Sequence, residues 1–224
     1  MTNLSEGKNA IETAVSEYGD LILIADTIEI AMADYITTIN QRFTSLVERT
    51  PADSKEGISL GTQMISDWVS NLYYRKMNSS IFLTQFAAFE YHLFEVAGYL
   101  ISKNNLAYLS TDDYLSRKGL RGSRINKIFR LITTECAIVF PENSQTRRVI
   151  SDFSQIRDII IHCNGNIPER KLLQFTSMIK SYSGLSIINP NSELFLETSF
   201  LKRSFYTFLG FFLELQNSQQ SLSR

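Results

Sequence analysis

Apolar residues recur every three or four positions along most of this chain, which is the spacing of the buried stripe of an α-helix. Over residues 9–48 the pattern predicts one long helix, or two helices that break near Gly19. Residues 51–61 contain a proline, two glycines and several short polar residues, a composition typical of a linker. The chain therefore begins with a helical extension at residues 1–50 that a linker joins to the rest.

Beyond the linker the same periodicity predicts further helices. The helix at residues 80–102 carries its apolar side chains on one stripe, formed by Phe82, Phe86, Phe89, Leu93, Val96 and Leu100. Other helices are expected at residues 62–78, 112–117, 123–134, 141–164, 168–180 and 199–216.

A short strand pair interrupts the helical pattern near the C-terminus. Residues 185–188 and 193–197 are rich in β-favouring side chains, and a turn-forming Asn-Pro-Asn-Ser segment separates them. The sequence therefore predicts an all-α protein with a small C-terminal β-hairpin and a long N-terminal helix. Its main domain is expected at residues 62–216, and the Ser- and Gln-rich residues 217–224 are expected to form a flexible tail.

The most informative polar residues lie within the apolar run at residues 156–165. This run holds Arg157, Asp158 and His162, and it ends at Asn164-Gly165, a pair typical of a helix C-terminus. A guanidinium binds phosphate through a planar fork of donors, and an imidazole moves protons near neutral pH. Together they can support phosphoryl chemistry on RNA without a metal.

Helix geometry sets how these three side chains can cooperate. Asp158 and His162 are four residues apart, so the carboxylate can orient the imidazole. Arg157 precedes His162 by five residues, about 140° around the helix and about 7.5 Å along it, so the two must converge on a ligand from different directions. The alternative is that His162 caps the helix while Arg157 makes an ordinary ion pair.

A second candidate is the segment at residues 117–130, which contains six cations and no acid. On a helix that begins after Ser123, three of these cations form one ridge, and free N–H groups at its start attract phosphate. This predicts a track for an RNA backbone, and the alternative is a solvated basic face. The expected RNA-binding residues are Arg121, Arg124, Lys127 and Arg130.

Composition and charge limit the expected partners, cofactors and cellular location of the protein. The formal net charge of -1 gives no overall nucleic-acid signature, so RNA contacts must come from local patches. The two cysteines have no paired spacing, and the N-terminus has no basic segment followed by an apolar run, so a cytoplasmic protein with free thiols and no membrane contact is expected. No cluster with metal-ligand spacing and no Gly-rich phosphate loop is present in the sequence, so neither a metal nor a cofactor is expected.

The segment from Arg157 to His162 resembles the R-x4-6-H signature of the HEPN superfamily. The polar residue after the arginine, the apolar residues before the histidine and the Asn-Gly break beyond it also match. The run from Phe86 to Leu93 resembles the first core helix of the family, which often carries an acidic residue such as Glu90. The resemblance covers roughly residues 79–180.

This resemblance implies a HEPN-like helical bundle whose homodimer brings two R-x4-6-H motifs face to face. In catalytic members it implies metal-independent RNA cleavage to a 2′,3′-cyclic phosphate, with Arg157 on the phosphate, His162 moving protons and Asp158 orienting His162. Glu90 and Asn164 are accessory candidates. The resemblance is also consistent with a role as a toxin or in phage defence, with an inhibitory protein partner.

A subset of these toxins carries, two residues after the histidine, a tyrosine that an antitoxin modifies, whereas this chain has Asn164. The competing hypothesis is a non-catalytic HEPN-fold interaction module or a nucleotide-binding partner subunit.

Overall fold

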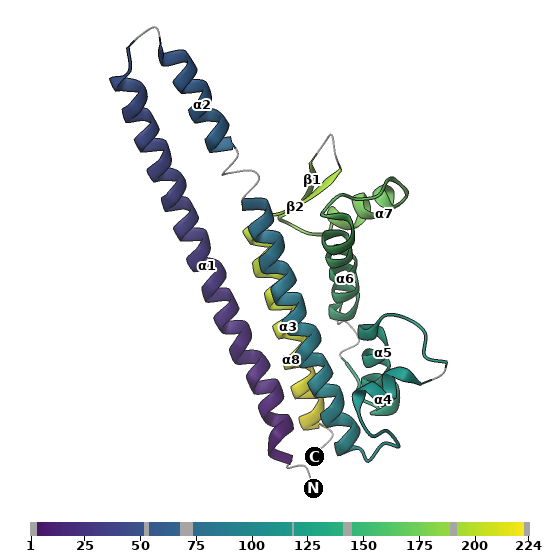
Figure 1. The fold of residues 1–224 in the computed structure, drawn as a ribbon. Coiled ribbons are helices and arrows are strands. Elements are labelled where there is room, and N and C mark those ends of the chain that lie inside the picture. The colour runs from purple at the N-terminus through teal and green to yellow at the C-terminus, as the bar shows by residue number, and fades with distance from the viewer. Residues whose placement is uncertain are drawn as a thin grey trace. The chain divides into compact units, whose positions relative to one another are not determined.

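A computed structural model describes residues 4–51, 54–67, 74–117, 119–140, 145–188 and 192–221 (Figure 1). Helices dominate these residues, and one antiparallel strand pair lies near the C-terminus, so the predicted all-α class is confirmed. The helices are α1 (Leu4–Arg49), α2 (Lys55–Asp67), α3 (Tyr74–Lys103), α4 (Thr111–Ser116), α5 (Arg124–Arg130), the π-helical turn η3 (Leu131–Glu135), α6 (Thr146–Cys163), α7 (Glu169–Ile179) and α8 (Thr198–Ser221).

Several helix ends lie where the sequence predicts them. The Ser123 hydroxyl accepts a hydrogen bond from the Asn126 N–H at 3.3 Å, so this residue caps α5 as expected. Helix α6 ends at Cys163, and Asn164 follows it in the left-handed region with φ of 51°. The expected start of that helix near Pro141 lies outside the described residues.

The structure has one long N-terminal helix, the first of the two alternatives that the sequence leaves open. Helix α1 runs unbroken through Gly19, where an added Cβ would meet nothing within 4 Å, because a solvent-facing glycine weakens a long helix without ending it. Other helix ends differ from the sequence expectation. Helix α2 begins at Lys55, so most of the expected linker is helical. Helix α8 continues to Ser221 and takes in most of the expected tail, and the Ser218 hydroxyl lies 2.9 Å from the Glu214 carbonyl oxygen of its own helix and 3.1 Å from the Val139 carbonyl oxygen.

The chain forms two compact units, each assembled from separated stretches of sequence. The first contains Met1–Asp20, Leu83–Asp158 and Arg203–Arg224, and the second contains Leu21–Phe82 and Ile159–Lys202. Long helices such as α1 and α3 contribute residues to both units, and the expected division into an N-terminal extension, a linker and one main domain stays a prediction.

Phenylalanines from α3 and α8 form the core of the first unit, where these helices run side by side (Figure 1). Phe89 stacks on Phe208 with ring centroids 4.7 Å apart, and Phe211 packs edge-on against Phe89 at 5.6 Å. The predicted stripe of α3 is confirmed, since each of its six residues is at most 1% exposed. A buried hydrogen bond of 2.7 Å from Ser204 to Gln85 fixes the register of the two helices.

The second unit holds the predicted hairpin, in which β1 (Leu185–Ile188) pairs antiparallel with β2 (Glu193–Leu196). The buried Asn78 side chain of α3 donates a hydrogen bond of 2.8 Å to the Leu196 carbonyl oxygen and fastens the hairpin to the start of α3. Across the described residues, no helix is both long enough and apolar enough to cross a bilayer.

Candidate functional site

Arg157 lies at the polar edge of α6, between two residues that anchor the helix in the core. Ile156 and Ile159 are at most 1% exposed, which leaves the guanidinium at the margin of the buried face with 30% of its side chain exposed. Its Nη1 donates to Asp158 Oδ1 at 2.8 Å, and its Nη2 donates to Glu90 Oε2 at 3.2 Å. The structure therefore brings three of the predicted site residues together.

These contacts fix both the charge and the direction of the Arg157 guanidinium. The hydrogen bond to Asp158 is the main reason that the pKa of Arg157 is raised above its ordinary value, so the group stays cationic. The guanidinium carbon also lies 5.7 Å from the centroid of the Phe86 ring, on which its flat face can rest. One cation faces two carboxylates, so the cluster of Glu90, Arg157 and Asp158 has a formal charge of -1.

His162 lies in the last turn of α6 and is exposed. A cation is favoured at a helix C-terminus, because the last carbonyl groups concentrate partial negative charge there. The Asp158 carboxylate is engaged by Arg157 in this structure, so the expected role of Asp158 in orienting His162 stays a prediction.

The turn after His162 is tied to the start of α3 and to the hairpin. The Gly165 N–H donates to the Ile159 carbonyl oxygen at 3.1 Å, and the Leu194 N–H donates to the Gly165 carbonyl oxygen at 2.8 Å. Lys76 of α3 donates to Asn164 Oδ1 at 3.2 Å. Asn164 is thus placed beside a cation that the sequence did not single out, because Lys76 precedes Asn164 by 88 residues and no local spacing links the two.

The start of α3 supplies a second cation to this region. Arg75 Nη1 lies 3.5 Å from Glu193 Oε2, and Lys76 Nζ lies 3.9 Å from Glu193 Oε1. Arg75 also lies over the Phe195 ring, 5.5 Å from its centroid. We refer to Arg75, Lys76, Asn164 and Glu193 as the α3–hairpin cluster.

The predicted RNA track falls on α5 and the turn before it. Arg121 and Arg130 are exposed, as a contact with a nucleic-acid backbone requires. Lys118, another cation of this segment, lies outside the described residues.

The two remaining residues of the track have partners within the protein. Arg124 lies 3.9 Å from Asp112 and stacks 4.4 Å from the centroid of the Phe94 ring. Lys127 is half-buried and donates to the Leu115 carbonyl oxygen at 3.1 Å. Arg124 nevertheless keeps 55% of its side chain exposed, so Lys127 is the one half-buried member of the expected track.

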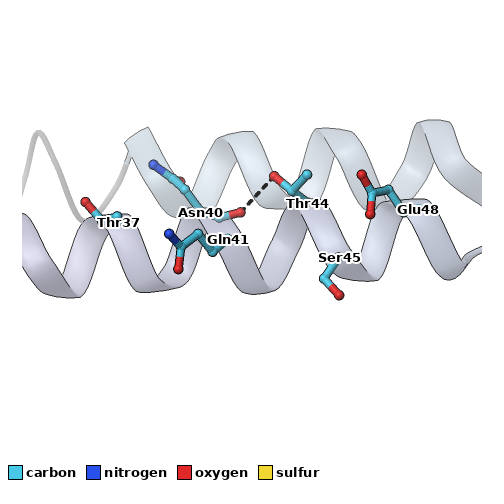
Figure 2. A pocket seen from close by; sticks show the side chains of 6 residues that line it. All are labelled: Thr37, Asn40, Gln41, Thr44, Ser45 and Glu48. Atoms are coloured by element: carbon cyan, nitrogen blue, oxygen red, sulfur yellow. Dashed lines mark hydrogen bonds between the residues drawn. The ribbon is translucent and has the colours of Figure 1, made fainter.

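A shallow hollow of about 410 Å³ lies along the polar face of α1 (Figure 2). The Thr44 hydroxyl donates to the Asn40 carbonyl oxygen at 2.9 Å and the Thr37 hydroxyl donates to Ala33 at 2.8 Å, so these donors are used within the helix. Its lining residues are Thr37, Asn40, Gln41, Thr44, Ser45 and Glu48. With one titratable side chain and no base or nucleophile pair, this hollow offers no catalytic constellation.

Within the residues that the structure describes, no group of three or more His, Cys, Asp or Glu side chains is arranged to hold a metal ion. Comparison of the chain with protein-family models, curated proteins and solved structures finds no match. The chemistry of the site is therefore inferred from its own residues and their geometry.

Proposed function

We propose that the protein is a metal-independent endoribonuclease of the HEPN type, acting as a homodimer in the cytoplasm in a toxin or phage-defence setting. The observation that carries the proposal is the arrangement on α6. A guanidinium held by two carboxylates and an exposed imidazole lie on one helix, five residues apart. This combination of groups is suited to phosphodiester chemistry.

In the proposed reaction the ribose 2′-oxygen attacks the adjacent phosphorus and the bond from phosphorus to the 5′-oxygen breaks. His162 takes the proton from the 2′-hydroxyl or delivers one to the departing 5′-oxygen, and the copy in the partner subunit serves the other transfer. The products are a 2′,3′-cyclic phosphate and a 5′-hydroxyl, so no water is consumed. Arg157 neutralises the charge that grows on the phosphate oxygens.

The ion pairs of Arg157 are compatible with this role if they pre-organise the guanidinium. Its planar fork has five N–H donors, and the hydrogen bonds to Asp158 and Glu90 use one from each terminal nitrogen. The remaining donors and the 30% exposed surface are available to a phosphate. Because the Arg157 side chain is already fixed, it loses less conformational entropy when the substrate binds.

The experiment is RNA cleavage by the purified protein in excess EDTA, with the products analysed for a 2′,3′-cyclic phosphate. We expect wild-type cleavage to persist, and Arg157→Ala to lower its rate about 10²-fold by removing the charge that meets the phosphate. Cleavage that EDTA abolishes and Mg²⁺ restores would contradict the proposed chemistry, and so would undiminished cleavage by Arg157→Ala.

A non-catalytic interaction module is the second candidate, and one observation favours it. The cluster of Glu90, Arg157 and Asp158 carries more negative than positive charge, which a phosphate would oppose. Under this alternative Arg157 joins α3 to α6 and the motif has no substrate. Wild-type protein that neither binds nor cleaves RNA would support it.

A further inference from the structure

The second unit contains a local excess of positive charge at the end of the motif helix. In the α3–hairpin cluster, Arg75 and Lys76 face the single carboxylate of Glu193, which gives a formal charge of +1. Asn164 belongs to this cluster and lies two residues beyond His162. This formal charge is opposite in sign to that of the cluster of Glu90, Arg157 and Asp158.

The position of His162 at a helix C-terminus favours such a cation for phosphate binding. The last carbonyl groups of a helix point toward its C-terminal end and repel an anion there. Glu90 and Asp158 offset part of the charge of Arg157 before substrate arrives. A further cation from outside α6 would therefore strengthen the binding of a phosphate beside His162.

Lys76 is better suited to supply that charge than Arg75. The Arg75 side chain is 21% exposed, rests on the Phe195 ring and pairs with Glu193, so it is largely committed to packing. The Lys76 side chain is 48% exposed, and its contact with Glu193 is long, at 3.9 Å. An ammonium group on a flexible stem can keep its hydrogen bond to Asn164 and still accept a second oxygen ligand.

We propose that Lys76 is a phosphate-binding residue of the RNA site, holding the phosphate beside His162, and that Asn164 positions it. This inference rests on the proposed ribonuclease function. It places a substrate contact at the start of α3. It also gives the Asn164 side chain a role in holding Lys76, in addition to the role of its backbone in ending α6. Glu193 then competes with the phosphate for Lys76.

The test uses the full chain and two RNA probes of one sequence, one cleavable and one with 2′-deoxy substitution at the cut position. Lys76→Gln should weaken binding of the uncleavable probe about fivefold to tenfold. It should also make the negative slope of log affinity against log salt shallower by about 0.7, the value for one phosphate contact on a single strand. Lys76→Arg should restore most of the binding. Lys103→Gln removes the same charge from the last turn of the same helix and should leave binding unchanged.

Two further variants separate charge from folding. Glu193→Gln removes the competing carboxylate and should tighten binding of the uncleavable probe. Asn164→Gly retains a residue suited to φ of 51° but deletes the Lys76 acceptor, so it should weaken binding by less than Lys76→Gln does. A merely structural role for this cluster would not produce opposite changes in affinity.

Wild-type cleavage together with unaltered binding and salt slope in Lys76→Gln would overturn this inference and leave the ribonuclease function standing. Unchanged affinity in Glu193→Gln would likewise count against competition for Lys76. Wild-type protein that neither cleaves nor binds the RNA probes would overturn both the inference and the function on which it rests.

Discussion

Arg157 and Glu90 are 67 residues apart in sequence, yet Nη2 of the arginine lies 3.2 Å from Oε2 of the glutamate. Their side chains are 30% and 28% exposed, so the pair is neither fully solvated nor deeply buried. It joins α3 to α6 beside the aromatic core, where Phe86 lies under the guanidinium. Glu90 therefore has two effects on Arg157, since it fixes the direction of the side chain and offsets its charge.

Replacing Glu90 with Gln should separate those two effects. The amide retains a hydrogen-bond acceptor for Arg157 but lacks the negative charge, so RNA affinity at low salt should rise severalfold. The free energy of unfolding should fall by about 1 kcal/mol or less, since a partly solvated ion pair contributes little. RNA binding titrations and chemical denaturation measure the two quantities.

The matched control is Glu95→Gln, which removes the same charge from an exposed position of α3. It should change neither quantity beyond experimental error. Equal affinity gains in both variants would mean that the Glu90 effect is only one of net charge, and that Arg157 is not the group it restrains.

His162 should be more important for cleavage than for stability. His162→Ala removes the proton-transfer group and should lower the single-turnover rate about 10²-fold or more. Because His162 is exposed, its loss should shift the free energy of unfolding by about 0.5 kcal/mol or less. His92→Ala gives the contrast, since His92 is 2% exposed and its Nε2 lies 2.9 Å from Glu17 Oε2.

That contrasting variant should destabilise the protein by a few kcal/mol while the activity of the folded fraction remains. The measurements are single-turnover kinetics and thermal unfolding of both variants. Wild-type cleavage by His162→Ala, in a preparation shown to be free of contaminating nuclease, would favour the interaction module over the enzyme.

The features that sequence predicts here are those with a local physical cause. The stripe of α3, the Ser123 cap and the break at Asn164 each depend on residues within a few turns of one another, and the structure confirms all three. The contact of Lys76 with Asn164 depends on how distant elements pack, so no spacing along the chain predicts it. The assembly of each compact unit from separated stretches of sequence depends on packing in the same way.

The boundary errors also have a physical cause. Glycine and short polar residues at positions 51–61 favour turns when considered alone, yet α2 begins at Lys55. A glycine costs a helix only about 1 kcal/mol relative to alanine, so two glycines weaken α2 without preventing it.

The protein should be a dimer, because Arg157 and His162 diverge on α6 and each half-site is incomplete alone. Light scattering at micromolar concentration should give a particle of twice the 25.6 kDa chain mass. A 25.6 kDa particle with full nuclease activity would contradict this prediction.

The two cysteines should differ sharply in reactivity. Cys136 is 8% exposed, and burial, assisted by the nearby charge of Glu135, raises its pKa to about 11. At pH 8 its thiolate fraction is then about 10⁻³, and the thiolate is the reactive form. Iodoacetamide at that pH should therefore modify Cys163, which is half-buried at the end of α6, long before Cys136. Peptide mass spectrometry over time measures the two rates.

The raised pKa of Cys136 also makes the stability of the protein depend on pH. Because the folded state raises the pKa of Cys136, it holds the proton more tightly than the unfolded chain does, and the associated stabilisation is complete below the ordinary value of 9.0. As pH rises from 9.0 toward 11, the unfolded chain loses its proton first and the free energy of unfolding falls, by at most about 1.4 kcal/mol per pH unit. Cys136→Ala lacks this titration, so its unfolding free energy should decline less steeply over that range in denaturant titrations. Parallel declines in wild type and Cys136→Ala would show that another group is responsible.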